Sequence, residues 1–353
     1  MGSLTSESDA SVQSQGAKRR RGCLFYILRT LTWFGIAVVA LLLLGLAYQT
    51  IATELDKRAY SPRGQLYTVN GRQMHIICAG QGSPVIVLHA GGAGDSLWWY
   101  RVQNQVAEHT RVCAYDRPGM GWSEPVDGPR DAPTIVAELR TLFEQAGVPA
   151  PYVMAGHSYG AILARVYAAQ YPGEVVGIVL VDSMPLEVEP GQPATEREFN
   201  QWMKRFNWLI ALNRWMVRTG LMRLIHSRDF QESGYPSDLA SELAALQLRD
   251  QVVDTNVAEI FGARWALYEA SAAAENLGDL PVAVLWAGES GTAQEYLSAI
   301  RAEIATYSTN TVTRVIAGAD HLSILRDQRY AAQVSAVLLN VIQAAQTGEP
   351  LAR

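Results

Sequence analysis

A short run near the middle of the chain carries the residue types that nucleophilic catalysis needs. Tyr152–Ala155 is an apolar run typical of a buried strand, Gly156-x-Ser158-x-Gly160 follows, and Tyr159–Gln170 has the pattern of a helix. A strand that turns directly into a helix at a serine makes a strained corner, where glycines on both sides let the backbone crowd together. The hydroxyl then projects above a helix N-terminus whose free N–H groups suit an oxyanion. This pattern predicts a nucleophile elbow with Ser158 as the nucleophile.

Other strand-like and helical runs surround this motif and would have to position it. Two runs flank Asn70-Gly71, which is a strong hairpin signal. We expect helices over 131–147, 293–307 and 328–345. We expect strands over 65–69, 72–78, 85–88, 112–115, 152–155, 175–181, 282–286 and 311–316.

Composition excludes several classes of function. The chain has 353 residues, 49% of them hydrophobic, which suffices for one large α/β domain with an insertion or for two domains. The net charge of the whole chain is −5. The first thirty residues carry a net charge of +3, so the rest of the chain carries −8. A nucleic-acid partner is therefore not expected. The three cysteines match no zinc spacing and no disulfide-rich scaffold, and we expect neither a metal nor a cofactor.

The N-terminal region predicts a membrane anchor. Residues 1–30 form a basic tail that we expect to be disordered, and Leu31–Ile51 carries no charge over twenty-one residues. At 1.5 Å per residue this stretch just spans a hydrocarbon core of roughly 30 Å. The basic cluster Lys18–Arg21 lies before it and predicts a cytoplasmic N-terminus. The rest of the chain would then lie on the extracytoplasmic side, beginning with a linker over 52–64.

Leu31–Ile51 has two other interpretations. A cleaved signal peptide is one, because Gly45-Leu-Ala47 resembles a cleavage site, although about thirty residues before the apolar run is long for such a signal. A buried core helix is disfavoured because the segment is apolar on every face. We therefore favour a retained single-pass anchor.

Two further motifs occur in a fixed order with the elbow. The strand over 85–88 ends in the Gly-rich loop 89–94, His-Ala-Gly-Gly-Ala-Gly, and the strand over 112–115 ends in 116–123, Asp-Arg-Pro-Gly-Met-Gly-Trp-Ser. With the elbow after them, the chain from about residue 65 onward resembles the α/β-hydrolase family. The resemblance implies an α/β fold with a mostly parallel central sheet and an inserted helical cap.

The resemblance also implies how the domain is divided. The core would comprise 65–185 and 279–346, the cap 186–278, and the C-terminal tail 347–353. Inside the expected cap, Thr195-x-x-Glu198 is a capping box, and an aromatic and apolar stripe at helical spacing follows it. We expect this stripe to pack on the core and, with Trp98 and Trp99, to wall the substrate pocket. Its residues are Phe199, Trp202, Met203, Phe206, Leu209, Ile210, Met216 and Val217.

The loop motifs suggest an oxyanion hole by the same resemblance. Gly91 falls where the family's Gly-rich loop supplies a backbone N–H, and the N–H of Tyr159 would be the second donor. Ala90 departs from the family's usual glycine at this point. We interpret Asp116 and Arg117 as residues that brace their own turn rather than touch substrate.

A serine nucleophile needs a base, and the base needs an acid that orients it. In this family the chain order is serine, acid, histidine. Of the two histidines after Ser158, His226 falls in the expected cap, whereas His321 falls in the loop where the family places its base. For the acid we favour Asp182, at the end of the strand before the cap, over Glu289, which follows the next strand. His157 is interpreted as packing and Asp320 as a surface or turn residue.

The resemblance places Cys78 and Cys113 on neighbouring strands. A disulfide between them is conceivable outside the cytoplasm, but we favour two small buried thiols.

These observations predict a membrane-anchored serine hydrolase that cleaves an ester with an apolar part through Ser158, His321 and Asp182. An aminopeptidase, a C–C bond hydrolase or an acyltransferase would share every residue named. A non-catalytic module that binds an apolar ligand is the alternative from another class. Serine rather than aspartate at the elbow argues against haloalkane dehalogenase or epoxide hydrolase chemistry. The oligomeric state stays open.

Overall fold

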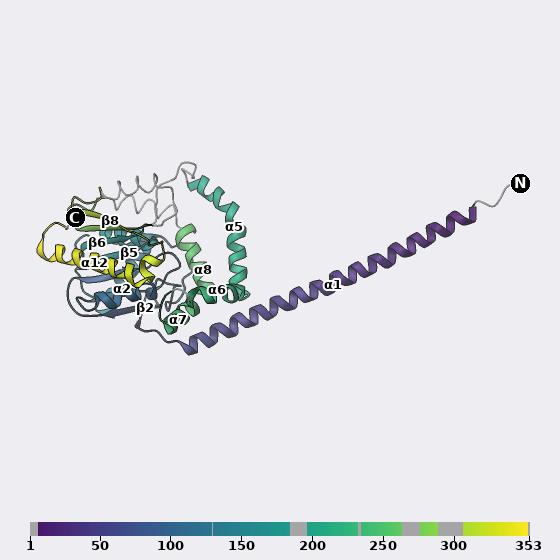
Figure 1. Ribbon diagram of the computed structural model, residues 1–353, viewed down its shortest axis with the longest axis horizontal. Helices are drawn as coiled ribbons and strands as arrows, with labels where there is room; N and C mark the ends of the chain where they lie inside the picture. Colours follow the sequence, from purple (N-terminus) through teal and green to yellow (C-terminus); the bar gives the residue numbers. More distant parts are fainter. Residues whose placement is uncertain are drawn as a thin grey trace.

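An eight-stranded sheet forms the centre of the molecule (Figure 1). The computed structural model describes residues 6–128, 130–183, 196–231, 234–262, 276–288 and 306–351. The strand order is β1-β2-β4-β3-β5-β6-β7-β8. The strands are β1 (Gln65–Val69), β2 (Arg72–Ala79), β3 (Val85–His89), β4 (Val112–Tyr115), β5 (Tyr152–His157), β6 (Val175–Val181), β7 (Val282–Ala287) and β8 (Thr311–Ile316).

Most neighbouring strands of this sheet run parallel. Strand β2 pairs antiparallel with β1 and with β4, and every pair from β4 to β8 is parallel. The carboxyl ends of β3, β5, β6 and β7 therefore meet at one edge of the sheet, where α/β proteins bind their ligands. The predicted fold class, a mostly parallel α/β sheet, is confirmed.

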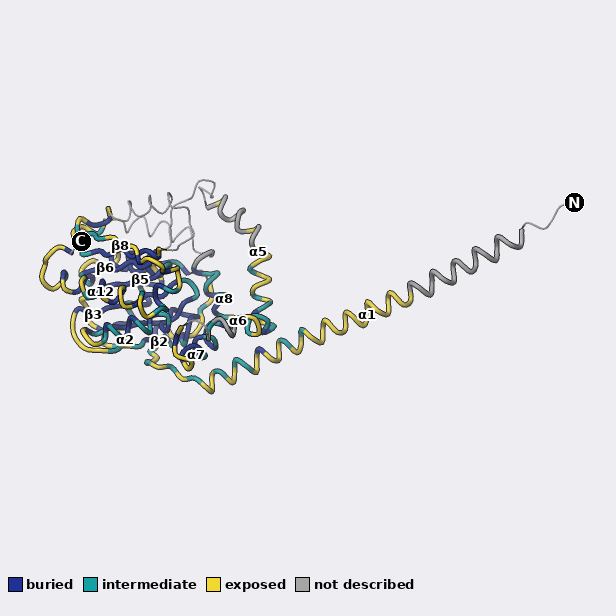
Figure 2. Tube along the Cα trace, in the orientation of Figure 1, coloured by how far each residue is buried: buried dark blue, intermediate teal, exposed yellow. Residues whose placement is uncertain are grey.

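Helices cover both faces of the sheet, and the strands alternate their side chains between the two layers. In β5, Met154 packs with α3 and α4, whereas Val153 and Ala155 pack with α2 and α12. The inner strands, β3 to β7, form the buried centre of the domain (Figure 2). The helices of the core are η1 (Ser96–Trp99, a 3₁₀-helix), α2 (Tyr100–Val106), α3 (Ala132–Ala146), α4 (Tyr159–Gln170), α11 (Ser323–Arg326) and α12 (Gln328–Thr347).

Local sequence explains where α3 begins and ends. The Asp131 side chain accepts a hydrogen bond from the Thr134 N–H, which satisfies one of the free donors of the first turn. Gly147 ends the helix with φ of +60°, a conformation that glycine adopts without a steric penalty. These two caps account for the agreement with the predicted helix over 131–147.

Further helices are inserted between β6 and β7. Helix α7 packs Leu239, Leu243 and Leu246 against Leu97 of η1, which ties the insertion to the core. The expected capping box at Thr195 and nearly all of the expected helix over 293–307 lie outside the described residues. We call the following segments the inserted helices: α5 (Glu196–Arg218), α6 (Leu221–Gln231), α7 (Ser237–Gln247), α8 (Asp250–Asn256) and a π-helix (Val257–Gly262).

The N-terminal region is one long helix, α1 (Ser6–Ala59). Its part Phe25–Ala59 is long and apolar enough to cross a membrane, and its most apolar window is not buried against the domain. Two expectations are wrong here, because residues of the tail are helical from Ser6 and the helix continues through most of the expected linker. No proline or glycine interrupts the chain between Gly45 and Pro62, and the last turns gain contacts with α5 and α7.

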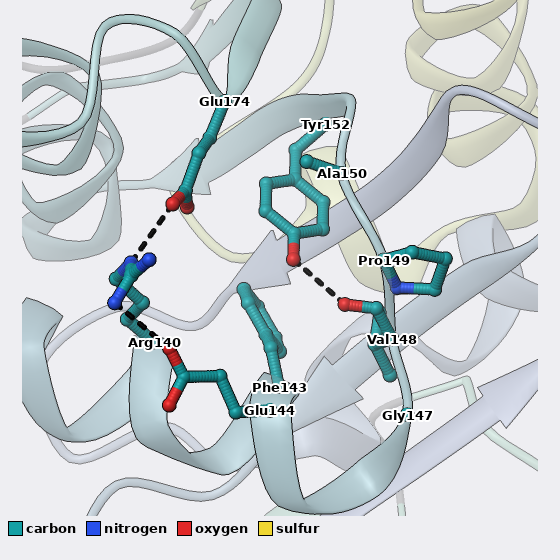
Figure 3. A pocket seen from close by; sticks show the side chains of 9 residues that line it. All are labelled: Arg140, Phe143, Glu144, Gly147, Val148, Pro149, Ala150, Tyr152 and Glu174. Carbon is teal, nitrogen blue, oxygen red and sulfur yellow. Dashed lines mark hydrogen bonds and ion pairs between the residues drawn. The ribbon is translucent and has the colours of Figure 1, made fainter.

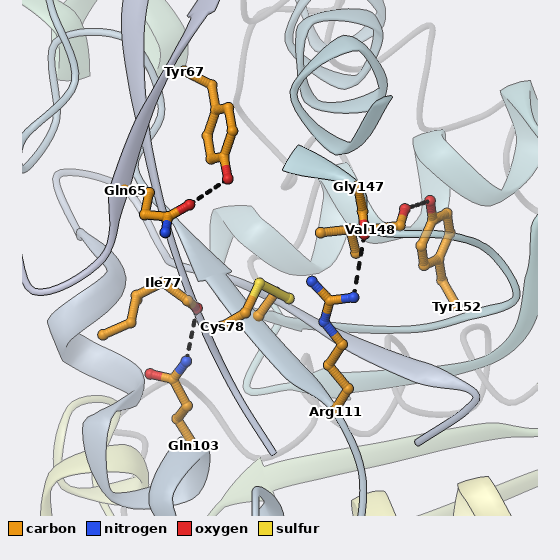
Figure 4. Close-up of a disulfide and its surroundings, with 10 residues drawn as sticks. Gln65, Tyr67, Ile77, Cys78, Gln103, Arg111, Gly147, Val148 and Tyr152 are labelled. Carbon is orange, nitrogen blue, oxygen red and sulfur yellow. Dashed lines mark hydrogen bonds between the residues drawn. A yellow bond between two sulfur atoms is a disulfide. The ribbon is translucent and has the colours of Figure 1, made fainter. Parts of the chain in front are cut away.

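Cys78 and Cys113 form a disulfide (Figure 4). They are directly opposite each other in the antiparallel β2–β4 pair, and their Cα atoms are 4.1 Å apart. The expectation of two buried thiols is therefore wrong. Cys113 is buried but Cys78 is exposed, so solvent can reach the bond.

Candidate active site

Ser158 occupies the corner between β5 and α4. Its φ of 53° and ψ of −119° lie outside the regions that most residues adopt. A Cβ on Gly156 would lie 2.2 Å from the Gly160 carbonyl oxygen, and a Cβ on Gly160 would lie 2.3 Å from the His89 carbonyl oxygen. The two glycines are therefore needed because the strand, the helix and the Gly-rich loop touch through their backbones. This is the geometry that the elbow motif predicts.

Asp182 and His321 are brought together from two strand ends. Asp182 follows β6, His321 lies in the loop after β8, and His321 Nδ1 is 2.6 Å from Asp182 Oδ2. The other carboxylate oxygen accepts a 3.0 Å hydrogen bond from the Ala287 N–H. Burial favours the neutral acid, but the bonds from His321 and Ala287 outweigh it and leave the pKa of Asp182 lowered. Asp182 is thus an anion at neutral pH, held where it can orient an imidazole.

The expected base, His321, lies beside His157, the residue that precedes Ser158. The rings of His321 and His157 are 4.6 Å apart between centroids, and His157 Nε2–H donates a 2.7 Å hydrogen bond to the His321 carbonyl oxygen. Burial lowers the pKa of His157 to about 3, so this ring is neutral and acts as a donor. His157 therefore does more than pack, because it holds the loop that carries His321.

The bond between base and nucleophile is not formed. Within the described part of the chain, Ser158 Oγ makes no hydrogen bond to the His321 ring, whose side chain is 48% exposed. Catalytic hydrogen bonds are often long or poorly aligned without substrate and tighten when it binds. The structure thus joins Asp182 to His321 and places the His321 ring next to His157 of the elbow, while proton transfer needs a hydrogen bond from Ser158 Oγ to that ring.

The two expected oxyanion donors flank the nucleophile. A Cβ on Gly91 would lie 3.2 Å from the Ser158 Cβ, so the Gly-rich loop passes directly beside the serine. Tyr159 is the first residue of α4, and its N–H has no acceptor within the helix. Both residues therefore adjoin Ser158, as the expected oxyanion hole requires.

Arg117 holds the Gly-rich loop in place. Its Nη1 donates to the Ala90 carbonyl at 2.7 Å and its Nη2 to the Gly91 carbonyl at 2.9 Å. Because a peptide unit is planar and trans, fixing the Ala90 carbonyl also fixes the opposed N–H of Gly91. Arg117 is therefore a positioning residue for the expected oxyanion donor, and it braces a neighbouring loop as well as its own turn.

Glu259 of the π-helix completes this support. Both its carboxylate oxygens lie 3.0 Å from Arg117 Nε, and both side chains are buried. Burial would lower the pKa of Arg117, but the attraction of Glu259 raises it, so the guanidinium stays charged. No spacing in the sequence indicates Glu259, because its position depends on the path of the inserted helices.

Two buried carboxylates, Asp116 and Asp95, brace the start of η1 and the turn after β4. Asp116 accepts hydrogen bonds from the N–H groups of Ser96 and Trp122, as expected for a residue that braces a turn. Asp95 accepts from the Leu97 N–H and, at 2.7 Å, from Gln247 Nε2 of α7. Burial, together with the nearby Asp116, raises the pKa of Asp95 to about 7. A titratable carboxyl therefore links the core to the inserted helices.

An apolar cavity of about 420 Å³ lies between the Gly-rich loop and the inserted helices. Ala93 lines it from the loop side, and Leu209, Ile210 and Val217 of the expected stripe line it from α5. Trp99 is fully buried, and the Trp98 ring lies 6.2 Å from that of His157. Met216, also of the expected stripe, does not line this cavity. The other side chains of the stripe lie outside the described residues: Phe199, Trp202, Met203 and Phe206.

A second hollow, of about 410 Å³, is unrelated to this chemistry (Figure 3). It lies at the start of β5, the end opposite Ser158, and Phe143 and Tyr152 line it. Arg140 pairs with Glu174 on its rim at 2.8 Å. No candidate nucleophile or base is among its lining residues.

Backbone strain is concentrated around the elbow. Among the described residues, four that are not glycine have positive φ, and three of them are Ala93, Ser158 and Asp182. Such strain persists where the surrounding structure enforces it, and it clusters at functional sites. The alternative acid Glu289 lies outside the described residues.

The chain is similar to known proteins over this same region. The pattern of the Alpha/beta hydrolase family matches residues 85–333. An uncharacterized protein of Schizosaccharomyces pombe is 28% identical over 267 residues, which are 66% of this chain and 47% of that protein. An AB hydrolase superfamily protein of Gibberella zeae is 40% identical over 104 residues, 28% of this chain and 32% of that protein. A (lyso)-N-acylphosphatidylethanolamine lipase of Mus musculus is 31% identical over 126 residues, 35% of this chain and 36% of that protein.

Solved structures show the same fold at lower identity. The epoxide hydrolase CorEH aligns with a TM-score of 0.59 at 18% identity and covers 78% of this chain and 96% of its own. An esterase from Thermogutta terrifontis aligns with a TM-score of 0.56 at 18% identity and covers 79% of this chain and 100% of its own. The chain spans less than half the length of these three curated relatives. Since the family pattern covers more than half of the chain, this protein belongs to the alpha/beta hydrolase family.

Proposed function

We propose that this protein is a membrane-anchored serine hydrolase that cleaves an ester with an apolar part. Ser158 attacks the ester carbonyl while His321 takes its proton, and Asp182 holds the imidazolium that forms. The N–H groups of Gly91 and Tyr159 bind the oxyanion. The alcohol leaves with the proton returned by His321, and water then hydrolyses the acyl-enzyme by the same two steps.

The hydrogen bond between His321 and Asp182 carries this proposal. At 2.6 Å, with a second bond from the Ala287 N–H, it fixes the acid and sets the tautomer of the imidazole. A module that only binds an apolar ligand needs no such pair beside a strained serine. Serine at the elbow forms an acyl-enzyme with a carbonyl substrate, which favours ester cleavage over epoxide opening.

The cavity supports an apolar substrate. Its volume of about 420 Å³ is within the range of small-molecule sites, and Ala93 joins it to the Gly-rich loop. The partial similarity to a (lyso)-N-acylphosphatidylethanolamine lipase points the same way, toward an acyl ester of a lipid.

The helix α1 and the disulfide support a membrane-anchored protein whose hydrolase domain lies on the extracytoplasmic side. Gly45 of α1 lies against the Thr219 carbonyl, so the helix is part of the packed structure, as expected of a retained anchor. The basic cluster Lys18–Arg21 favours a cytoplasmic N-terminus. The Cys78–Cys113 disulfide suits an oxidising compartment on the other side.

Covalent labelling tests the chemistry. A fluorophosphonate probe should modify wild-type protein at Ser158 and leave a Ser158→Ala variant unmodified. Hydrolysis of p-nitrophenyl esters of increasing chain length then tests the pocket, and the rate should rise with acyl length until the cavity is filled. Absence of an adduct in folded wild-type protein would favour the ligand-binding module, and equal rates for all chain lengths would contradict the apolar pocket.

A further inference from the structure

The inserted helices expose an apolar surface that the described part of the chain leaves uncovered. Trp208, Leu212 and Trp215 follow one another at helical spacing on one face of α5, and each is between 43% and 63% exposed. Soluble monomers rarely leave large apolar side chains in a contiguous exposed patch. We call the following residues the α5–α6 patch: Trp208, Leu209, Leu212, Trp215, Leu224 and Ile225.

The turn between α5 and α6 lies directly against α1. A Cβ on Gly45 would lie 2.6 Å from the Thr219 carbonyl oxygen, and one on Gly220 would lie 2.7 Å from Tyr48 Cδ1. Counted from Arg29, about 20 residues at 1.5 Å each cross a hydrocarbon core of roughly 30 Å and end near Gln49. The turn therefore meets α1 just inside the outer boundary of the hydrocarbon core that α1 would span.

Polar contacts on the domain side set the angle between α1 and the inserted helices. Gln49 Nε2 donates to the Leu248 carbonyl at 2.8 Å, and Arg223 Nη1 pairs with Asp56 at 2.7 Å. Figure 1 shows α5 and α6 on the side of the domain from which α1 departs. The patch is thus held close to the membrane surface by the helix that enters it.

Two charges at the C-terminal end of α5 pair with α8, and Lys204 lies one turn before Trp208 on the face of the patch. Arg214 pairs with Asp254 of α8 at 2.5 Å, and Arg218 pairs with Asp254 at 3.4 Å and Asp250 at 4.0 Å. The face of Trp208 and Leu212 thus carries tryptophans of the kind that concentrate at membrane interfaces, next to a lysine that can reach lipid headgroups.

We propose that the α5–α6 patch inserts into the outer leaflet of the bilayer that α1 spans, and that lipid esters enter the active site from that leaflet. Leu209 belongs both to the patch and to the lining of the cavity, and Ala93 at the far side of the cavity adjoins the Gly-rich loop. A lipid chain that fills the cavity would therefore extend along apolar side chains from the patch to the Gly-rich loop. The entry route rests on the proposed hydrolase chemistry, whereas the insertion rests only on the proposed membrane anchor.

Spin labels on the full-length chain in lipid nanodiscs test the insertion. In a Cys23→Ser background, a nitroxide at Leu212→Cys is compared with one at Leu41→Cys, in the exposed span, and one at Ala336→Cys, on the exposed face of α12. Oxygen concentrates in lipid and a nickel chelate in water. Insertion predicts that the Leu212 label relaxes with oxygen as the Leu41 label does. A Leu212 label that responds to nickel as the Ala336 label does overturns the insertion.

Kinetics test the entry route separately. A Trp208→Glu and Leu212→Glu double variant keeps good helix formers but charges the patch. It should hydrolyse an acyl ester embedded in phosphatidylcholine vesicles at least about tenfold more slowly than wild type, a loss of about 1.4 kcal/mol or more. It should keep the wild-type rate on soluble p-nitrophenyl butyrate. The control is Leu66→Glu, an exposed apolar residue of β1, which should change neither rate.

Each outcome decides one claim. Unchanged vesicle hydrolysis in the double variant overturns the entry route, and so does an equal loss on both substrates, since the pocket rather than membrane access would then be damaged. Failure of the fluorophosphonate to label Ser158 overturns the hydrolase function and leaves the spin-label result on insertion valid.

Discussion

Glu259→Gln tests whether the inserted helices control the oxyanion hole. Gln keeps the shape of the side chain but removes the charge that faces Arg117 Nε at 3.0 Å. Leaving a buried charge without its partner costs about 3–5 kcal/mol. Arg117 retains the carbonyls of Ala90 and Gly91, so we expect the lower end, about 3 kcal/mol, which lowers the melting temperature on the order of 10 °C.

The effect on catalysis should exceed the effect on binding. Without the charge of Glu259 we expect the guanidinium to shift while it keeps its bonds to the two carbonyls, so that the peptide between Ala90 and Gly91 is held in a displaced orientation. Loss of an oxyanion donor costs about 10²–10³ in kcat, and since Gly91 is displaced rather than removed, we expect a drop of about tenfold to a hundredfold. KM for a p-nitrophenyl ester should change little, because the cavity is not altered.

A second buried pair supplies the matched control. Arg130 donates to both carboxylate oxygens of Glu138, at 3.0 and 2.6 Å, and both side chains are nearly inaccessible. Glu138→Gln should lower the melting temperature by a similar amount but leave kcat per folded molecule near the wild-type value, because Arg130 makes no hydrogen bond to the Gly-rich loop among the described contacts. Equal losses of kcat in both variants, or full activity in Glu259→Gln, would refute the reasoning.

Three further predictions follow from the same structure. Asp182→Asn should lower kcat by up to about 10⁴-fold in ester turnover, whereas Glu289→Gln should not; the reverse result would make Glu289 the acid. The disulfide joins cysteines 35 residues apart, so replacing Cys78 and Cys113 by Ser should cost about 4 kcal/mol in urea unfolding, and an unchanged midpoint would contradict this. The pKa of Asp95 is raised from 3.8 to about 7, so the folded state holds a proton that the unfolded state has released, and stability falls as pH rises from about 4 to 7. Asp95→Asn should remove this fall, on the order of 4 kcal/mol, and parallel curves of melting temperature against pH would exclude it.

The sequence predicted the sheet because its strands are short apolar runs in a fixed order with the loop motifs. Strand β5 was predicted to end at Ala155 but pairs through Gly156 and His157, since backbone pairing with β3 and β6 continues where the apolar run stops. The register that places Cys78 opposite Cys113 could not be read from the sequence, because a shift of one residue would separate them.

The candidate site was predictable in part for a similar reason. Ser158, Asp182 and His321 follow strand ends, so the parallel sheet brings their loops to one edge. Glu259 lies in the insertion, whose path is set by packing such as that of α7 on Leu97, and no local pattern reports it. The role of Asp182 rather than Glu289 stays a prediction until the two variants are compared.

The backbone corner at Ser158 restricts which residue types can occupy positions 156 and 160 far more than it restricts the residue type at position 158. Side chains at Gly156 and Gly160 would strike backbone atoms, whereas the position between them leaves its side chain partly open to solvent. A carboxylate or a thiol fits there as well as a hydroxyl does, while a β-branched residue is disfavoured by the φ of 53°. A scaffold with this corner can therefore exchange its reactive atom by one substitution without rebuilding its backbone, which makes the elbow a natural starting point for redirecting the protein to new chemistry.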